Sequence, residues 1–367
     1  MKLYFYLVGF ILLATSCVND KADSTNDNTI TSIETDTLKN SYAEAFRIIE
    51  HEDSTEIQII NIENKEVEFK YFIGVGEDNN SIKLNPGRVV ALSSTHIGMM
   101  EELQLLDKIV GISSDKYLCS SSLKKRVEQG KTSTVGDIGN GDVEGYLAVR
   151  PDLIIYSGFD TKAAILQKLK SAGLKTFTNY DWKETHPLGR AEWLKIFGVI
   201  FNKRKEANSL FDKIESKYLA LVDKMKKTTT KPSVLVGTMY GDVFNTPAGE
   251  SYMAKLLTDA NSDYQYASTS GTGSLSLSLE EIISDNRNVD VWLNVAAQTK
   301  SDIIDMNKKF NLLNAFQKDK VYSYYKNVNC FWEKSAVQPH IVLKDFCKIF
   351  YPNMFEDDDL VFYHQLE

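Results

Sequence analysis

The feature that most constrains the fold is a long helical stretch that divides the chain into two halves. Apolar residues recur through it at steps of three and four: Ala207, Leu210, Phe211, Ile214, Tyr218, Leu221, Val222 and Met225. This spacing predicts one helix from about 203 to 227, roughly 37 Å long at 1.5 Å per residue. Short apolar runs alternate with amphipathic segments on either side of it. We therefore expect an α/β protein, with two doubly wound α/β lobes joined by one long helix.

The strand pattern repeats on both sides of that helix. Continuous apolar runs at 89–92 and 153–156 predict strands that are covered on both faces of a parallel sheet. The pattern restarts after Pro232, with a further run at 233–236. Upstream, residues 57–73 alternate apolar and polar residues, which predicts a β-hairpin added to the first lobe.

The N-terminus has the layout of a secretory signal. Lys2 precedes an apolar run at 3–13 that is too short to span a bilayer, and small residues follow. Residues 13–17, Leu-Ala-Thr-Ser-Cys, resemble a bacterial lipobox, in which the cysteine is acylated. We predict a signal peptide at 1–16 and lipid attachment at Cys17. The alternative is an ordinary cleaved signal with an incidental cysteine.

Residues 17–41 are rich in Asp, Asn, Ser and Thr and contain no aromatic residue. Such a segment cannot bury enough apolar surface to offset its ordering entropy, so we expect a disordered tether. The domain boundaries that follow are an N-terminal lobe with the hairpin at 42–185, connecting helices at 186–227 and a C-terminal lobe at 228–367.

Charge and cysteine content narrow the function. The formal net charge is −8, and Lys and Arg are scattered rather than gathered in a stripe, so we expect no nucleic-acid partner. Besides Cys17, the chain has three cysteines, Cys119, Cys330 and Cys347. They lack the spacing of a metal site, and an odd number of cysteines cannot form a complete disulfide framework. Cys347 lies in a helical apolar pattern, so we expect it in the core.

Five segments, in this order, resemble the helical-backbone solute-binding proteins of ABC importers for ferric siderophores, haem and cobalamin. They are GRVVALSSTHIGMMEELQLLDKIVGIS at 87–113, VGDIGNGDVEGYLAVRPDLII at 135–155, HPLGRAEWLKIFGVIF at 186–201, LSLEEIISDNRNVDVWLN at 277–294 and FWEKSAVQPHIVLKDFCKIFYP at 331–352. The added hairpin and tether resemble members from Bacteroidetes-like bacteria.

The resemblance implies a monomeric protein that works outside the inner membrane. Its expected partners are an ABC permease with its ATPase, a small-molecule metal chelate, and the membrane through a lipid anchor. The expected location is the periplasm, with the cell surface as the alternative. Small lobe motions, no catalysis and no cofactor are also implied. The rival classes are an enzyme and a surface receptor, but Gly-x-Ser-x-Gly, His-Glu-x-x-His and Walker motifs are missing from the sequence.

Ligands of parallel α/β sheets sit beyond the carboxyl ends of the strands. That rule selects these candidate ligand-binding residues: Ser94, Thr95, His96, Tyr117, Ser157, Trp182, Tyr240, Asn294, Asn329 and Trp332. Helix capping is an equally good reading of residues 93–95, and core packing is the alternative for Tyr240 and Trp332. For His96, a hydrogen bond to the neighbouring loop is favoured over ligand contact.

The choice among chelates rests on what these loops contain. Members of the family that bind anionic siderophores typically present several arginines, whereas here Arg126 and Arg190 are the nearest, so the resemblance disfavours an anionic siderophore. Cobalamin binders of the family place tryptophans where this chain has Ile138 and Ser274. The histidines are scattered and disfavour capture of a bare metal ion. A neutral or weakly charged ferric chelate is therefore expected, with haem and cobalamin as alternatives.

Glu144 and Glu280 each open a predicted helix, one in each lobe. The family resemblance implies that they dock to basic residues of the permease. The other interpretation is that both complement helix dipoles, and the two roles are compatible.

Overall fold

A 22-residue helix, α7 (Arg204–Met225), connects the two halves of the chain, close to the predicted 203–227. Five of its residues are buried along one stripe: Ala207, Phe211, Ile214, Tyr218 and Met225.

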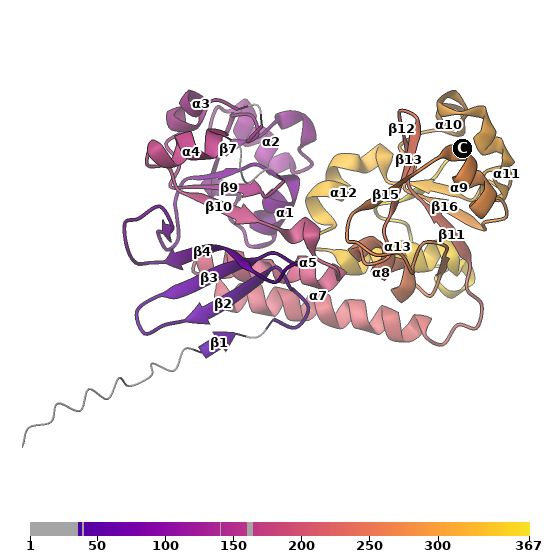
Figure 1. The fold of residues 1–367 in the computed structure, drawn as a ribbon, viewed down its shortest axis with the longest axis horizontal. Coiled ribbons are helices and arrows are strands. Elements are labelled where there is room, and N and C mark those ends of the chain that lie inside the picture. Colours follow the sequence, from indigo (N-terminus) through magenta and orange to yellow (C-terminus); the bar gives the residue numbers. More distant parts are fainter. Residues whose placement is uncertain (1–35, 39, 140, 160–163) are drawn as a thin grey trace, which may run out of the picture. The chain divides into compact units, whose positions relative to one another are not determined.

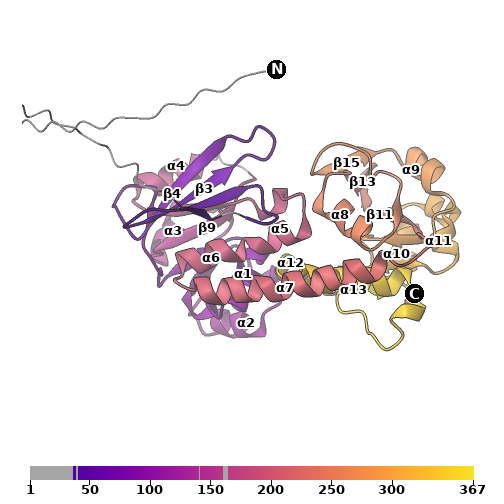
Figure 2. The ribbon, with the colours of Figure 1, turned by 90° about the horizontal axis from the view of Figure 1, so that it is seen from below.

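This computed structural model describes residues 36–38, 40–139, 141–159 and 164–367, so Cys17 and the signal segment lie outside the described residues. Figures 1 and 2 show α7 running alongside both lobes, with α5 (Pro187–Glu192) and α6 (Leu194–Ile200) preceding it. None of the helices in the described part of the chain is both long and apolar enough to cross a membrane.

The first lobe is built on a five-stranded parallel sheet of order β10-β9-β6-β7-β8. Its strands are β6 (Val89–Ala91), β7 (Ile109–Ile112), β8 (Ser133–Thr134), β9 (Leu153–Ser157) and β10 (Thr176–Asn179). Its helices are α1 (Ser94–Glu102), α2 (Ser121–Glu128), α3 (Val143–Ala148) and α4 (Ala164–Ser171). The three central strands are almost wholly buried, as their continuous apolar runs predict.

The second lobe repeats this plan with order β14-β11-β16-β17-β18. Its strands are β11 (Ser233–Val236), β14 (Asp263–Tyr264), β16 (Val291–Leu293), β17 (Val321–Ser323) and β18 (His364–Gln365), of which β18 alone runs antiparallel. A small antiparallel sheet adds β12 (Thr238–Tyr240), β13 (Val243–Pro247) and β15 (Ser274–Leu277). Its helices are α8 (Tyr252–Asp259), α9 (Leu279–Asn286), α10 (Lys300–Met306), α11 (Asn314–Gln317), α12 (Val328–Lys334) and α13 (Pro339–Phe350).

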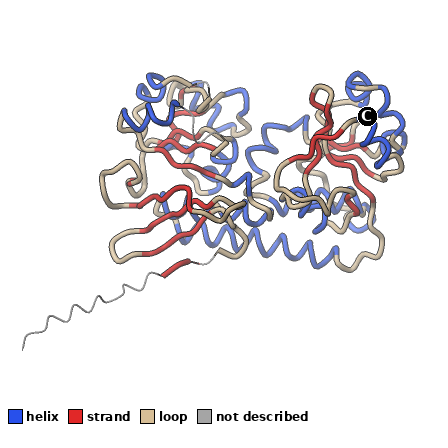
Figure 3. The backbone as a smooth tube through the Cα atoms, viewed as in Figure 1, coloured by secondary structure: helices blue, strands red, loops and turns tan. Residues whose placement is uncertain are grey.

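Short 3-10 turns complete the connections in both lobes. They cover Leu106–Lys108, Asp115–Tyr117, Asp181–Lys183, Lys308–Leu312, Tyr325–Asn327 and Pro352–Met354. The predicted fold class, two α/β lobes joined by a long helix, is confirmed. Figure 3 shows the strands of the separate sheets among the helices that cover them.

The predicted N-terminal hairpin is present but is part of a larger sheet. Its strands are β1 (Asp36–Leu38), β2 (Phe46–Glu50), β3 (Thr55–Ile60), β4 (Val67–Ile73) and β5 (Ser81–Ile82). Since β1 pairs with β2, the end of the predicted tether at residue 41 is wrong for 36–38, which are a strand. Residues 36–38 (Asp-Thr-Leu) are too few to show an alternating pattern. Their strand conformation comes from pairing with β2.

Two buried carboxylates attach this added sheet to the helices. Glu192 accepts backbone N–H groups from Ser41, Tyr42 and Ala43 at 2.8–2.9 Å. Glu184 accepts those of Glu44 and Ala45 at 2.8 and 3.1 Å. The largest apolar core continues from this sheet through α5, α6 and α7 into the second lobe. A separate cluster, which includes Tyr146, lies on the other face of the first lobe's sheet.

Candidate ligand-binding cleft

The predicted residues lie at or beyond the ends of strands in both lobes, and Tyr117, Tyr240 and Trp332 among them are exposed. In the first sheet the strand order reverses between β6 and β9, and Ser94 and Ser157 lie at their carboxyl ends. In the second sheet it reverses between β11 and β16, beyond which Asn294 lies. Topological switch points of this kind are the usual ligand sites of open α/β sheets.

The first loop is mainly structural. Ser93 is the N-cap of α1, and its hydroxyl accepts the Thr95 N–H, so the capping interpretation is correct for this pair. Ser94 is partly exposed, whereas Thr95 is buried and donates to Asp181 Oδ1 at 3.3 Å. The structure thus places Ser94 closer to solvent than Thr95.

His96 lies in the core, and ligand contact by its ring is excluded in this conformation. The side chain is 0 % exposed, with its ring 6.4 Å from that of Phe197. Burial lowers the pKa of His96 to about 4, so the imidazole is neutral. The prediction of a ligand contact at this position is therefore wrong, because the ring points inward from the first turn of α1.

Arg190 offers no free positive charge to the cleft. Its guanidinium is buried, pairs with Asp181 Oδ2 at 3.0 Å, and stands 4.2 Å above the Tyr252 ring. Arg126 donates instead to the carbonyl oxygens of Asp107 and Ile109. Sequence reasoning missed Asp181, whose only signal was its place directly after a buried strand. Both arginines nearest the loops are thus used by the fold.

Exposed aromatic side chains mark the first lobe's side of the cleft. Tyr117 is 61 % exposed and Phe159, two residues after Ser157, is 72 % exposed. Phe159 stacks on Trp182 with ring centroids 4.4 Å apart and planes 23° apart. Lys183 lies over Tyr180 and Trp182, 4.4 and 5.4 Å from their ring centroids. Of these rings, Tyr117 and Phe159 offer flat apolar faces to a solute.

The second lobe contributes two further exposed rings. Tyr240 is 65 % exposed at the end of β12, and Trp332 is 42 % exposed on α12, so core packing is not their role. Trp332 packs edge-on against Tyr324, at a centroid distance of 5.7 Å and an interplanar angle of 81°. Tyr324 in turn stacks on the buried Phe331 at 3.9 Å. The Trp332 ring is thus held from one side and open on the other.

The two predicted asparagines are largely committed to structure. Asn294 adopts φ +64°, a left-handed conformation that Asn tolerates, and its Oδ1 accepts the Tyr363 hydroxyl at 2.5 Å. Asn329 donates from Nδ2 to the Lys116 carbonyl at 2.8 Å and so connects the two lobes.

Glu144 and Glu280 occupy matching positions, in the first turns of α3 and α9. Both are exposed, and Asp142 and Ser278 cap the respective helices. Glu280 pairs with Lys309 at 2.6 Å, and this contact lowers the pKa of its carboxyl. Within the described ranges, Glu144 has no ion-pair partner within 4.0 Å.

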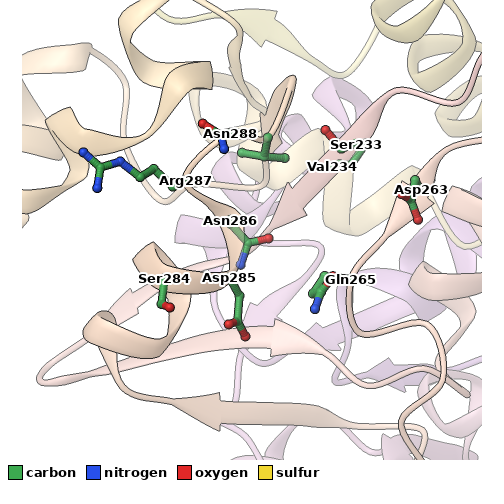
Figure 4. Close-up of a pocket in the computed structure, with 10 residues that line it drawn as sticks. Ser233, Val234, Asp263, Gln265, Ser284, Asp285, Asn286, Arg287 and Asn288 are labelled. Carbon is green, nitrogen blue, oxygen red and sulfur yellow. The ribbon is translucent and has the colours of Figure 1, made fainter.

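A small cavity is lined by Arg190, Tyr252 and Phe331 among others, and two further hollows lie away from these residues. Figure 4 shows a pocket of about 190 Å³ at the amino end of β11 and the carboxyl end of α9, lined by Ser233, Asp263, Asp285 and Arg287 among others. A groove of about 700 Å³ lies between the added sheet and the second lobe, with Glu44, Lys65, Glu250 and Lys255 in its lining. Neither lining contains a predicted ligand residue. Among the residues that the structure describes, no three His, Cys, Asp or Glu side chains form a group that could hold a metal ion.

Comparison with known proteins agrees with this architecture. The chain is 27% identical over 294 residues to an uncharacterised lipoprotein of Methanocaldococcus jannaschii, covering 77% of this chain and 69% of the relative. It is 22% identical over 246 residues to an uncharacterised ABC transporter substrate-binding lipoprotein of Bacillus subtilis, covering 66% and 74%.

Solved structures share the fold. The crystal structure of a possible iron-binding (periplasmic solute-binding) protein from Staphylococcus epidermidis matches with a TM-score of 0.58 and 21% identity, covering 73% of this chain and 99% of that one. A family model described as periplasmic binding protein matches residues 89–328, nearly two thirds of the chain. The match begins at β6 and ends at the start of α12, so it includes the first lobe's parallel sheet, α7 and all strands of the second lobe's sheet except β18. The chain therefore belongs to the periplasmic binding protein family.

Proposed function

We propose that this solute-binding protein captures an iron-siderophore-type chelate and delivers it to the permease of an ABC importer. The observation that carries the proposal is the set of exposed rings on both lobes at the loops beyond the strand ends. It comprises Tyr117, Phe159 stacked on the half-buried Trp182, Tyr240 and Trp332.

The chemistry of these rings suits the organic shell of a chelate. Aromatic faces contact flat or apolar ligand surfaces closely, and the Tyr hydroxyls and Trp N–H groups add hydrogen bonds at the edges. The chelator holds the iron, so the protein contacts chelator atoms. Because Arg190 is neutralised by Asp181, the proposal favours a neutral or weakly charged ferric chelate. Haem and cobalamin remain the alternative solutes.

The proposed location is outside the inner membrane, with Cys17 as the lipid attachment site. A disulfide between Cys119 and Cys330 supports export, since disulfides persist in oxidising compartments. The relatives from M. jannaschii and B. subtilis described above are both named as lipoproteins. The proposed partners are the permease and ATPase of the importer, and the protein acts as a monomer without catalysis.

Tryptophan fluorescence of the full chain tests the proposal. Trp193 and Trp292 are fully buried, while Trp182 and Trp332 lie at the cleft, so quenching by a solute reports mainly on the latter pair. One member of a panel of ferric siderophores, haem and corrinoids should quench saturably at one equivalent. Trp182→Ala and Trp332→Ala should each weaken binding by about tenfold or more, the loss expected for a buried aromatic contact.

Leu219→Ala is the matched control, because Leu219 is an exposed apolar residue of α7. Its affinity should equal that of the unmodified chain. Recovery of the solute unchanged after incubation separates binding from turnover. Absence of saturable quenching across the panel, with the protein folded, contradicts capture of this solute class.

A further inference from the structure

A disulfide connects the two lobes. Cys119, just before α2 in the first lobe, is bonded to Cys330, in α12 of the second; they are 211 positions apart in the sequence, and their Cα atoms lie 4.8 Å apart. Both half-cystines are partly exposed. A covalent bond at this place limits how far the two loops that carry it can separate.

The surrounding contacts make the same connection without covalent bonds. The Glu333 carboxylate, from α12, is fully buried and accepts the N–H groups of Cys119 and Ser120 at 2.8 and 2.9 Å. These groups precede α2, so one lobe supplies the polar cap of a helix in the other. Nearby, Asn329 donates to the Lys116 carbonyl at 2.8 Å.

Helices α1 and α12 meet at backbone contact beside the disulfide. A Cβ atom added at Gly98 would lie 1.8 Å from the carbonyl oxygen of Glu333, so only glycine fits there. Figures 1 and 2 both show α12 next to α1. The lobes therefore meet in a close-packed junction between α1 and α12, and the disulfide connects them covalently beside it.

Exposed aromatic residues flank the disulfide on both lobes. Tyr117 lies two residues before Cys119, and Trp332 lies two residues after Cys330. Each ring is therefore separated from the covalent link by a single intervening residue. The separation of the Tyr117 and Trp332 backbones is set by the disulfide more directly than by any hinge motion about α7.

We propose that the Cys119–Cys330 disulfide is a positioning staple that holds Tyr117 and Trp332 at the spacing in which the cleft accepts its solute. The solute-affinity part of this inference rests on the proposed function. Reduction by a dithiol breaks the S–S bond, yields two protein thiols and oxidises the reagent to its disulfide. The loops at 113–120 and 328–335 then move more freely, and the solute pays the entropy of ordering them on binding.

Hydrogen exchange of the full chain, before and after reduction, tests the staple without a ligand. Exchange of backbone amides at 113–120 and 328–335 should accelerate about tenfold or more. Loss of a disulfide typically raises the equilibrium constant for local opening by more than about tenfold. The acceleration at these two loops should exceed that at amides of the central strands β11 and β16, which exchange mainly through global unfolding and report only the loss of overall stability. The Cys119→Ser/Cys330→Ser double variant should match the reduced protein and should not respond to the reductant.

Solute affinity and chemical rescue separate positioning from general stability. With any panel member that binds, reduction should raise the dissociation constant about tenfold, and a short bis-alkylating reagent that bridges the two thiols should restore it. Unchanged exchange at both loops would overturn the staple, as would equal affinity of the oxidised and reduced protein. If the loops loosen on reduction but no panel member binds, the staple is supported and the chelate proposal fails.

Discussion

Buried carboxylates connect segments that are far apart in the sequence. Each accepts backbone N–H groups that would otherwise be unpaired, and each is nearly inaccessible to solvent. They are Glu184 and Glu192, which hold residues 41–45, Glu333, which caps α2 from the other lobe, and Asp345, which holds Val361, Phe362 and Tyr363 at 2.7–3.1 Å. Because each carboxyl group accepts two or more backbone N–H groups, a single side chain fixes the backbone of a whole loop.

Glu184 predicts a specific pH dependence of stability. Burial raises its pKa to about 7 from 4.5, against the smaller opposite effect of its N–H donors, Glu44, Trp193 and Ala45. The folded state therefore keeps a proton that the unfolded state releases above pH 4.5. The contribution to the unfolding free energy is full below pH 4.5 and is lost as the pH rises to about 7, by about 3 kcal/mol in all.

Urea denaturation of the unmodified chain and of Glu184→Gln at several pH values between 4.5 and 8 measures this effect. Other titrating groups cancel in the difference between the two proteins. The advantage of the unmodified chain over the variant should shrink by about 3 kcal/mol across this range. A constant difference would show that Glu184 is ionised in the folded protein throughout.

For individual residues, the sequence predicted solvent exposure better than it predicted which side chains contact one another. Tyr240, the last residue of β12, and Trp332, in α12, are exposed, as proposed for cleft residues. The inward rotation of His96 and the Asp181–Arg190 pair were not predictable, because both depend on which element packs above a given side chain. No local pattern in one sequence contains that information.

Among the elements, the strands and helices with strong periodicity were predicted closely. The run at 233–236 is β11, and the helix expected at 203–227 is α7, Arg204–Met225. The added sheet was predicted only as a hairpin, since β1 and β5 have three and two residues and no period of their own. They adopt strand conformation because β1 pairs with β2 and β5 pairs with β4.

The backbone contact between α1 and α12 at Gly98 makes this junction sensitive to one added methyl group. Gly98→Ala places a methyl group on the Glu333 carbonyl and must push the two helices apart. We expect a loss of about 2 kcal/mol in unfolding free energy, the usual cost of overpacking a close contact. Chemical denaturation of the purified variant measures it.

Gly273→Ala is the matched control, because a Cβ atom at that position has no neighbour within 4 Å. Its stability should stay within about 0.5 kcal/mol of the unmodified chain. Equal stability of the two variants would mean that α1 and α12 do not meet at backbone contact.

For the whole molecule, the order of α/β half, long helix and α/β half was visible in the sequence because each half repeats its own strand–helix alternation. The link between the halves was not. Cys119 and Cys330 lie 211 positions apart, and the three cysteines other than Cys17 suggested no complete pairing. Their contact follows from the packing of α12 on α1, which only the folded chain reveals.

The two lobes also offer a pair of exposed acidic groups to a partner. Glu144 and Glu280 open α3 and α9, which Figure 1 draws away from α7, on either lobe. Their environments differ, since Glu280 already pairs with Lys309 whereas Glu144 has no such partner among the described residues. A basic surface of the permease would therefore compete with Lys309 at one lobe only.

Charge reversal tests docking to the permease. Glu144→Lys, Glu280→Lys and the double variant should leave solute titration unchanged, because neither residue lies among the cleft aromatics. Exposed charges steer encounter and fix register, and like charges across an interface oppose it, so cellular uptake should fall sharply and most in the double variant. Since Glu280 is partly neutralised, Glu144→Lys should have the larger single effect.

Glu206→Lys, in the first turn of α7, is the control for a lost helix-dipole contact and should support normal uptake. Normal uptake in the double variant, or weaker solute binding in either purified single variant, would rule these glutamates out as docking points.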